Sequence, residues 1–560
     1  MKRRIPLKRP GHGGAAGRIV AALGSLLLLS GAALGLQQWL RALSGERPRV
    51  EVTPPGPVLQ LPTVIVARGE ARKGSFTLDG APVPEGLQKD RRTVMLGPAD
   101  LTPGLHQLAW KQTFVGQRER GVSLGMMVGP FREAGEATPC ALKATVRQAA
   151  LDTFSPELSL LVREKAAAVK GLPKIVRSEA RLLLVEGGLD AQTKVTFADG
   201  SELQAIVPLA LAPKLDAPVQ VKLRGDVKVD VSGAVGAMAS LKGGGLLAAL
   251  AEVVQRPERG LEGALSAARQ AGNEVVRAEV QGALEGWLSR FDEELKELFP
   301  TELSTELLGV RARLTLTPCG TPKVRPGKAL ILRHGIGLAI DAEGLAPPSA
   351  AADLPGPVRR EGAELDGRTG PGAAPISLQL SPAAIDAFLD AAWRSGALSL
   401  LGADPELVRR TNARLAGRVS FRLRSVELRL PPVLELGGAQ SLLRASEATL
   451  HLEEQEAGPV DLVLSGAASL EAKVGERTMV LTARATGVEG SCRRDDGDTE
   501  VREPCYPELL SALSDVLVTQ GTLSHERGSA LGLSRARVWV SGVGLDPEGL
   551  KVDLQVQPTP

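Results

Sequence analysis

The only serine motif that could serve a hydrolase lies in a glycine-rich stretch. Gly121-Val122-Ser123-Leu124-Gly125 has the G-x-S-x-G spacing that holds a nucleophilic serine on a sharp turn between a strand and a helix. The following residues, MMVGPF, do not form a helical pattern, and no aspartate and histidine follow in a suitable order. We therefore treat the motif as a chance match and expect no enzymatic activity.

Metal-binding residue types are present but not in metal-binding patterns. The sequence has five scattered histidines: His12, His106, His334, His451 and His525. None has the paired spacing of a zinc site. One acidic cluster is present: Asp495, Asp496, Asp498 and Glu500. It lacks the twelve-residue calcium pattern, so a solvated loop is the preferred interpretation. No glycine loop suited to a phosphate is present, and we expect neither a metal nor a cofactor.

Four cysteines, Cys140, Cys319, Cys492 and Cys505, all follow the N-terminal segment. In an oxidising compartment they would form disulfides, and four cysteines allow three connectivities. Cys492 and Cys505 bracket a short polar stretch, so we favour their local pairing, which leaves Cys140 for Cys319. The alternative is four buried free thiols.

The N-terminus has the charge pattern of an exported or anchored protein. Residues 1–18 contain six basic side chains and no acid, and residues 19–40 begin with an apolar run from Ile19 to Leu36. This asymmetry keeps the N-terminus on the cytoplasmic side of a membrane. The run is near the minimum length for a permanent span, and Ala33-Leu34-Gly35 has the small residues of a signal cleavage site. A transmembrane anchor and a cleaved signal peptide both stay open.

The overall charge and composition argue against nucleic-acid binding. The 67 basic and 64 acidic side chains nearly cancel, so no strong field attracts a polyanion. One Tyr and nine Phe in 560 residues also leave few rings on which bases could stack.

Beyond the N-terminus the residue pattern divides the chain into four segments. Residues 48–132 alternate as short strands, with Asp79-Gly80 as a hairpin turn; they resemble the immunoglobulin-like spacer domains of bacterial surface and secreted proteins. Residues 138–345 combine strands and helices, and residues 346–374 are an Ala/Pro/Gly-rich linker. The same order of elements then returns in residues 375–558, where Ser381-Pro382 marks a helix start.

Two stretches have an apolar stripe at helical spacing. One comprises Val276, Val280, Leu284, Trp287, Phe291, Leu295 and Leu298. The other comprises Ile385, Phe388, Leu389, Ala392 and Trp393. Both patterns predict α-helices with one apolar face, which in most proteins packs into the core.

The last third of the chain resembles a known family. The stretches SLQLSPAAIDAFLDAAWRSGALSL, LPPVLELGGAQSLLRASEATLHLE and ALGLSRARVWVSGVGLDPEGLKVDLQV are similar, in this order, to the C-terminal domain of the bactericidal/permeability-increasing and lipopolysaccharide-binding protein family. The family belongs to the tubular lipid-binding superfamily. The resemblance of residues 138–345 to that plan is in the order of elements only.

The resemblance implies an α+β fold with two tubular lipid-binding modules, each a long helix on a curved antiparallel sheet, joined end to end. An Ig-like sandwich and an N-terminal transmembrane or signal helix would precede them. It implies a non-enzymatic protein of the bacterial envelope, periplasmic and either anchored or secreted, that binds or transfers phospholipid or lipopolysaccharide. The implied lipid contacts are Val276, Val280, Leu284, Trp287, Phe291, Ile385, Phe388, Leu389, Trp393 and Phe421. The alternative is a structural or adhesive envelope protein with self-filled modules and protein partners.

Overall fold

The structure is a computed structural model, and it describes about two thirds of the chain. The described residues are 49–68, 73–113, 120–153, 155–167, 173–214, 217–232, 301–307, 310–341, 345–360, 365, 374–399, 405–416, 419–436, 441–454, 458–474, 479–496, 498–504, 509–510, 520–521 and 536–558.

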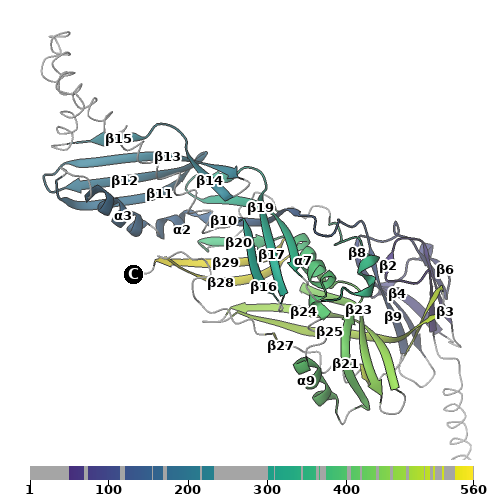
Figure 1. Ribbon diagram of the computed structural model, residues 1–560. Coiled ribbons are helices and arrows are strands. Elements are labelled where there is room, and N and C mark those ends of the chain that lie inside the picture. The colour runs from purple at the N-terminus through teal and green to yellow at the C-terminus, as the bar shows by residue number, and fades with distance from the viewer. Residues whose placement is uncertain are drawn as a thin grey trace, which may run out of the picture.

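Residues 49–128 form two facing sheets (Figure 1). The first contains β1 (Arg49–Thr53), β3 (Thr63–Arg68), β7 (Thr93–Leu96) and β6 (Gln88–Asp90). The second contains β2 (Val58–Leu59), β9 (Arg120–Val128), β8 (Gly104–Thr113), β4 (Lys73–Leu78) and β5 (Ala81–Pro82), and the short helix η1 (Glu85–Leu87) precedes β6. Asp79-Gly80 joins β4 to β5 with both residues at positive φ, as the hairpin pattern predicted.

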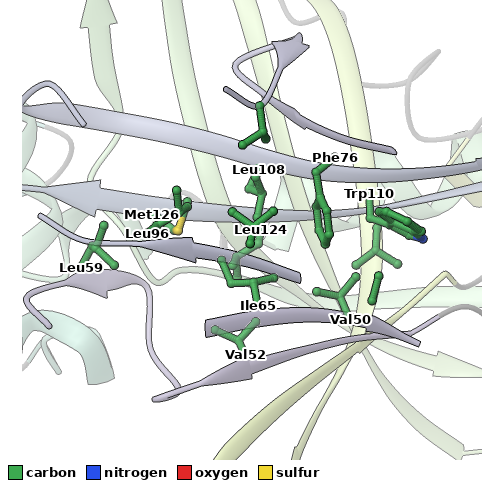
Figure 2. Close-up of a cluster of buried hydrophobic side chains, with 14 of the residues drawn as sticks. Val50, Val52, Leu59, Ile65, Phe76, Leu96, Leu108, Trp110, Leu124 and Met126 are labelled. Carbon is green, nitrogen blue, oxygen red and sulfur yellow. The ribbon is translucent and has the colours of Figure 1, made fainter. Parts of the chain in front are cut away.

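The two sheets enclose a common apolar core (Figure 2). Val50 and Val52 alternate with outward-facing residues on β1, and Ile65 faces inward from β3. From the second sheet, Leu108 and Leu124 meet them. The alternating pattern of residues 48–132 is thus the pattern of strands with one wet face.

The first of these sheets does not end at β1. Strand β1 pairs with β26 (Thr499–Glu503), and the sheet continues through β25 (Met479–Asp496), β24 (Gly458–Val474) and β23 (Ser441–Glu454) to β21 (Phe421–Leu428). Short strands β22 (Val433–Glu435) and β27 (Gln520–Gly521) pair with β23 and β25, and helix α9 (Pro405–Leu415) lies against β21. The N-terminal sandwich and the C-terminal third therefore share one sheet.

A second large sheet lies in the middle of the molecule (Figure 1). Its strands in spatial order are β16 (Glu302–Leu307), β17 (Val310–Pro318), β19 (Ala329–Asp341), β10 (Thr138–Arg147), β20 (Ile376–Leu380), β29 (Gly549–Pro558) and β28 (Ala536–Asp546), with β18 (Lys323–Arg325) beside β19. Strand β10 is hydrogen-bonded to both β19 and β20. Residues on both sides of the predicted linker thus form one sheet, which we call the central sheet.

The far end of the molecule is a five-stranded antiparallel sheet. It contains β11 (Ile175–Val185), β12 (Gly188–Phe197), β13 (Glu202–Lys214), β14 (Ala217–Leu223) and β15 (Lys228–Val231). Helices α2 (Gln148–Thr153) and α3 (Ser155–Ala167) lead from β10 onto β11.

Helix α7 (Pro382–Arg394) follows β20 directly. Ser381 caps it by accepting a hydrogen bond from the Ala384 N–H, and Pro382 occupies the first turn, as the sequence predicted.

The predicted α+β fold of two modules, each with a long helix on a curved sheet, is wrong. The described residues are mostly strand, and the longest helices among them, α3 and α7, have 13 residues each. Within the ranges given above, no helix is long and apolar enough to cross a membrane. The described strands pair antiparallel except β2 with β9. The order of elements misled the prediction because it does not reveal pairings such as β1 with β26 or β10 with β20.

Two predicted helices lie outside the described residues: the apolar run of residues 19–40 and the stripe of residues 276–298.

The predicted linker is packed where it is described. Leu354 and Val358 are buried in a cluster with Met127 of β9 and Trp393 of α7, beside the short helix η3 (Ser349–Ala352). The N–H of Arg132 donates to the Pro357 carbonyl at 2.9 Å. This segment therefore fastens the sandwich to α7.

Candidate functional site on the central sheet

Strand β10 separates aliphatic from polar side chains. Leu142, Ala144 and Val146 alternate with Lys143 and Thr145, and side chains alternate between the two faces of a strand. One face of β10 is therefore aliphatic and the other polar.

The neighbouring strands extend this separation in register. Opposite Leu142, Ala144 and Val146, strand β20 places Leu380, Leu378 and Ile376. Opposite these, β29 places Leu550, Val552 and Leu554. On the other side of β10, Leu332 and Leu330 of β19 face Ala144 and Val146. We call this set of eleven side chains on β19, β10, β20 and β29 the aliphatic face.

On β10 and β20 the burial of the two faces is the reverse of the usual order, whereas Leu330 of β19 and Leu554 of β29 are buried on the aliphatic face. On the polar face, Lys143, Thr145 and Gln379 are 3%, 4% and 6% exposed. On the aliphatic face, the β10 and β20 side chains are only half-buried. Aliphatic side chains normally take the deeper positions and polar ones the wet positions, so the aliphatic face is a partly uncovered apolar surface among the described residues.

Three apolar clusters divide the aliphatic face between them. At one end Val146, Leu330 and Leu332 pack against Leu184 and Val207 of the five-stranded sheet. At the other end Leu142 and Leu380 pack with Ile336 and with Ala384 of α7. On β20 and β29, Ile376, Leu378, Val552 and Leu554 pack with one another and with Val540 and Val556. This third cluster contains only side chains of the central sheet among the described residues.

In helix α7, too, charged side chains are more deeply buried than apolar ones. Asp386 and Asp390 are 5% and 3% exposed, whereas Ile385, Phe388 and Leu389 are only half-buried. Trp393, by contrast, is fully buried, and its Nε1–H donates to the Leu428 carbonyl at 2.6 Å.

The buried carboxylates of α7 have altered acidity. Burial raises the pKa of Asp386 to about 6, although Arg360, whose Nε lies 2.6 Å from a carboxylate oxygen, lowers it in part. Burial also raises the pKa of Asp390 against the opposing effect of Arg394, one turn later on the helix. Asp386 joins α7 to Arg360 and accepts a hydrogen bond from the Leu434 N–H, whereas Asp390 pairs with Arg394 of the same helix.

The structure does not gather the predicted lipid contacts at one place. Ile385, Phe388 and Leu389 share a half-buried side of α7, but Trp393 belongs to the core beside the former linker. Phe421 packs on another cluster, around Leu423 and Leu450 of the C-terminal sheet. Val276, Val280, Leu284, Trp287 and Phe291 lie outside the described residues. Their contact with lipid stays a prediction.

Sequence reasoning missed the aliphatic face, although a signal was present. The stretches ISLQL and LKVDLQV alternate strictly between aliphatic and polar residues. That period of two predicts strands with two unlike faces. It does not predict that the polar face is the buried one.

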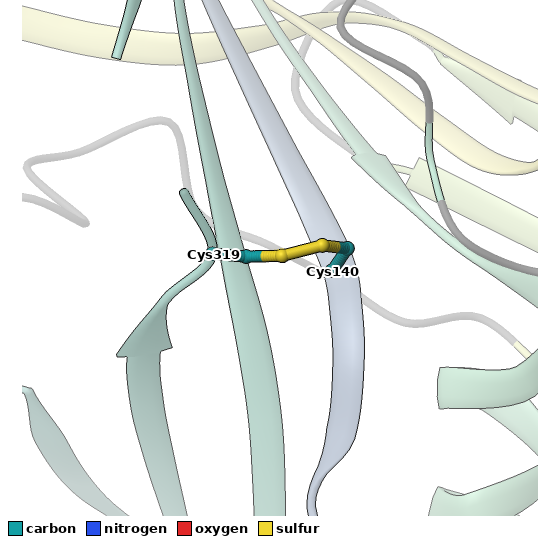
Figure 3. The surroundings of a disulfide bond; sticks show 2 residues. All are labelled: Cys140 and Cys319. Atoms are coloured by element: carbon teal, nitrogen blue, oxygen red, sulfur yellow. A yellow bond between two sulfur atoms is a disulfide. The ribbon is translucent and has the colours of Figure 1, made fainter. Parts of the chain in front are cut away.

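The disulfide between Cys140 and Cys319, expected if Cys492 pairs with Cys505, is present. Cys140 of β10 is bonded to Cys319, which follows β17, with their Cα atoms 5.3 Å apart (Figure 3). Cys492 is also disulfide-bonded, and its predicted partner Cys505 lies outside the described residues.

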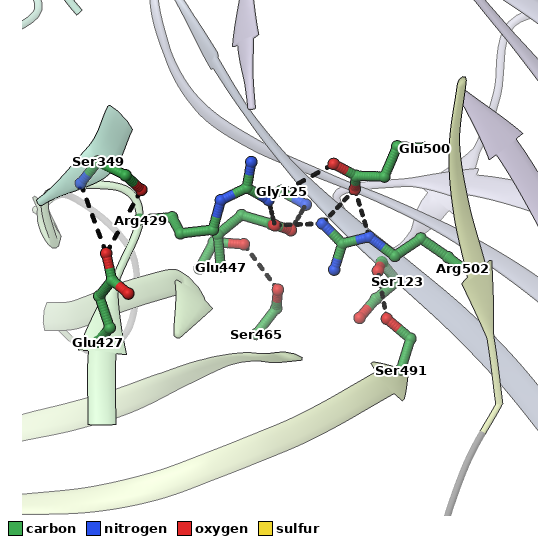
Figure 4. Close-up of polar contacts among 11 residues, drawn as sticks. Ser123, Gly125, Ser349, Glu427, Arg429, Glu447, Ser465, Ser491, Glu500 and Arg502 are labelled. Carbon is green, nitrogen blue, oxygen red and sulfur yellow. Dashed lines mark hydrogen bonds and ion pairs between the residues drawn. The ribbon is translucent and has the colours of Figure 1, made fainter. Parts of the chain in front are cut away.

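A second polar cluster lies where the N-terminal sandwich meets the C-terminal sheet (Figure 4). Arg502 forms ion pairs with Glu447 and Glu500, and Arg429 lies 3.4 Å and 3.5 Å from the same two carboxylates. Burial raises the pKa of Glu500, but the charges of Arg502 and Arg429 outweigh it and hold the pKa below its usual range. Glu500 was expected in a solvated loop; it is 2% exposed instead.

The G-x-S-x-G motif lies in this same region, within strand β9. Ser123 is 3% exposed, and its carbonyl accepts a hydrogen bond from the Ser491 hydroxyl. A serine in the middle of a strand lacks the sharp strand-to-helix turn that a nucleophile elbow requires. Among the residues that the structure describes, no three His, Cys, Asp or Glu side chains lie close enough together to hold a metal ion.

Comparison with known proteins gives only weak resemblances. No family model and no curated protein matches the sequence. One similar solved structure is a lipopolysaccharide binding protein, with 11% identity and a TM-score of 0.31 over 75% of this chain and 99% of that chain. Another is P47 of Clostridium botulinum E1, with 8% identity and a TM-score of 0.26 over 75% of this chain and all of that one.

Proposed function

We propose that the protein binds lipid in the bacterial envelope by covering the aliphatic face with acyl chains. The observation that carries the proposal is the inverted burial of the central sheet. Lys143, Thr145 and Gln379 are buried, while the aliphatic side chains of β10 and β20 behind them are half-exposed. A hydrocarbon chain is the simplest partner for a surface without donors, acceptors or charges.

The energetics favour a long hydrocarbon chain over a small polar ligand. Each buried methylene contributes about 0.8 kcal/mol, so a single acyl chain along the aliphatic face supplies several kcal/mol without any polar contact. Such binding selects for chain length more than for head group. Phospholipid and lipopolysaccharide are both suitable, since each has long acyl chains.

The N-terminal sequence also supports the proposal, because its pattern is that of an exported protein. The basic residues 1–18 and the apolar run after them have the pattern of a chain directed across the inner membrane. We place the folded domains on the periplasmic side, either anchored or released after cleavage.

Site-specific photo-cross-linking tests the proposal. A benzoylphenylalanine in place of Leu378 lies on the aliphatic face, and one in place of Ser377 lies on the opposite face of the same strand. In vesicles of phosphatidylethanolamine and phosphatidylglycerol, we expect the probe at position 378 to capture lipid and the probe at position 377 to capture none. Equal capture at the two positions, or none at either, contradicts lipid binding on this face.

The same experiment distinguishes lipid binding from the alternative, a structural or adhesive protein whose interior is filled by its own side chains. In that case the probe at position 378 forms a cross-link to a peptide of this chain, such as residues 276–298, whose apolar stripe could cover the face. Native mass spectrometry would then find the purified protein without lipid.

A further inference from the structure

One end of the N-terminal sandwich has an uncharged apolar surface. Residues 52–67 contain no charged side chain. Within and beside this run three large apolar side chains face solvent: Leu61 at 64% exposed, Val64 at 37% and Met95 at 50%. Val64 and Met95 are directly opposite each other on β3 and β7. Pro54, Pro55 and Pro62 are exposed beside them. We call these six residues the apolar tip.

The other end of the same sheet face is basic. Strand β1 enters at Arg49, opposite Arg68 on β3, and Glu51 lies between them at 3.2 Å and 3.0 Å from their Nε atoms. Arg92 is also exposed. It lies close to Arg68, because the Arg92 carbonyl accepts a hydrogen bond from the N–H of the neighbouring Ala67. Asp90 also lies here, since its carboxylate accepts a hydrogen bond from the Arg92 N–H. Three arginines against Glu51 and Asp90 leave this end positive by one charge.

The chain that precedes the sandwich limits where this face can lie. The apolar run ends at Leu36 and β1 begins at Arg49. The intervening residues 37–48 span at most about 40 Å when fully extended, at ~3.3–3.6 Å per residue. If the apolar run is inserted in a membrane, the sandwich is held within that distance of the bilayer.

We propose that the apolar tip docks on the lipid bilayer that holds the N-terminal segment. Leu61, Val64 and Met95 enter the interface between head groups and acyl chains, where exposed apolar side chains are stabilised. Arg49, Arg68 and Arg92 face anionic head groups from the other end of the sheet face. The docking is independent of lipid binding on the central sheet, and it rests on membrane insertion of residues 19–36.

Quenching of tryptophan emission by brominated phospholipid tests this docking. The full chain is reconstituted in vesicles of phosphatidylethanolamine and phosphatidylglycerol with brominated acyl chains, carrying either Met95→Trp or Ser75→Trp. Ser75 is exposed on β4, in the opposite sheet of the sandwich. Both variants keep the five native tryptophans, so any difference comes from the added residue.

Native Trp39 lies next to the inserted run and is quenched equally in both variants. We expect a larger loss of emission for Met95→Trp than for Ser75→Trp, and adding Leu61→Asp should reverse much of the difference. Equal quenching of the two variants overturns the proposal. So does a shift of Met95→Trp emission that follows protein concentration without lipid, because a second copy then covers the tip. Lipid capture at Leu378 is measured separately, so failure of one proposal leaves the other standing.

Discussion

Glu447 and Arg502 form an ion pair in which neither side chain is exposed to solvent. Glu447 belongs to β23 and also accepts a hydrogen bond from the Gly125 N–H of β9 at 2.9 Å. Arg502 belongs to β26, which pairs with β1. The pair thus joins the N-terminal sandwich to the C-terminal sheet through both of the sandwich's layers.

Replacing Arg502 by Met should destabilise the protein strongly. The substitution leaves Glu447 and Glu500 buried without their main counter-charge, which typically costs about 3–5 kcal/mol. The free energy of unfolding in urea measures the effect. The control is Arg424→Met, which removes an exposed pair with Glu453 and should cost about 0–1 kcal/mol. Similar losses for both variants would contradict a structural role for the buried pair.

Gly125→Ala should loosen the same junction by a steric route. A Cβ at this position would overlap the hydroxyl of Ser446 on β23, and overpacking of this kind costs about 1–3 kcal/mol. Gly86→Ala is the control, since no atom lies within 4 Å of its added Cβ. Adding Ser446→Gly to Gly125→Ala should recover part of the thermal stability; no recovery would mean that the clash is not the cause.

Asp386 should make stability depend on pH between about 4 and 6. Burial raises the pKa of Asp386 from 3.8 to about 6 in the folded protein. Folding therefore binds a proton in this window, and stability is lost as pH rises through it. The loss is about 3 kcal/mol, at ~1.36 kcal/mol per pH unit. The raised pKa of Asp390 acts in the same direction.

The measurement is urea unfolding at several pH values. Asp386→Asn should flatten the profile, because the amide does not titrate, whereas Asp353→Asn at an exposed position nearby should leave it as in the wild type. A wild-type stability that rises from pH 4 to 6 would contradict the prediction.

Removing the disulfide of Cys140 and Cys319 should cost much of the stability. The bond joins residues 179 positions apart, and for a loop of this size the chain-entropy model gives about 5 kcal/mol. We expect the double variant Cys140→Ser, Cys319→Ser to unfold at a markedly lower urea concentration. Wild-type protein treated with reductant should lose at least as much stability, because reductant also breaks the disulfide of Cys492. A double variant as stable as the wild type would show that the strand pairings alone hold β10 and β17 on the two sides of β19.

Local features were predictable because they depend on neighbouring residues. The Ser381 cap of α7 and the turn at Asp79-Gly80 were both correct, since each follows from a few side chains and their backbone preferences.

Pairings between distant strands were not predictable in this way. Nothing local in RVEVT indicates that it pairs with TEVRE, because many strands present the same unpaired backbone groups. The acidic stretch around Glu500 looked solvated for the same reason: Arg429, 71 positions earlier in the chain, reaches Glu500 only after the sheet has formed. The candidate site depended on such pairings throughout, since the aliphatic face combines β10, β20 and β29.

The pairing of β1 with β26 also affects how the chain reaches its fold. A ribosome makes residues 49–53 some 450 positions before residues 499–503, so the edge of β1 has no partner while most of the chain is still being synthesised. Contacts this distant along the chain form slowly, and an open strand edge can pair with another molecule. The nascent N-terminal sandwich is therefore the part of this protein that most needs a chaperone.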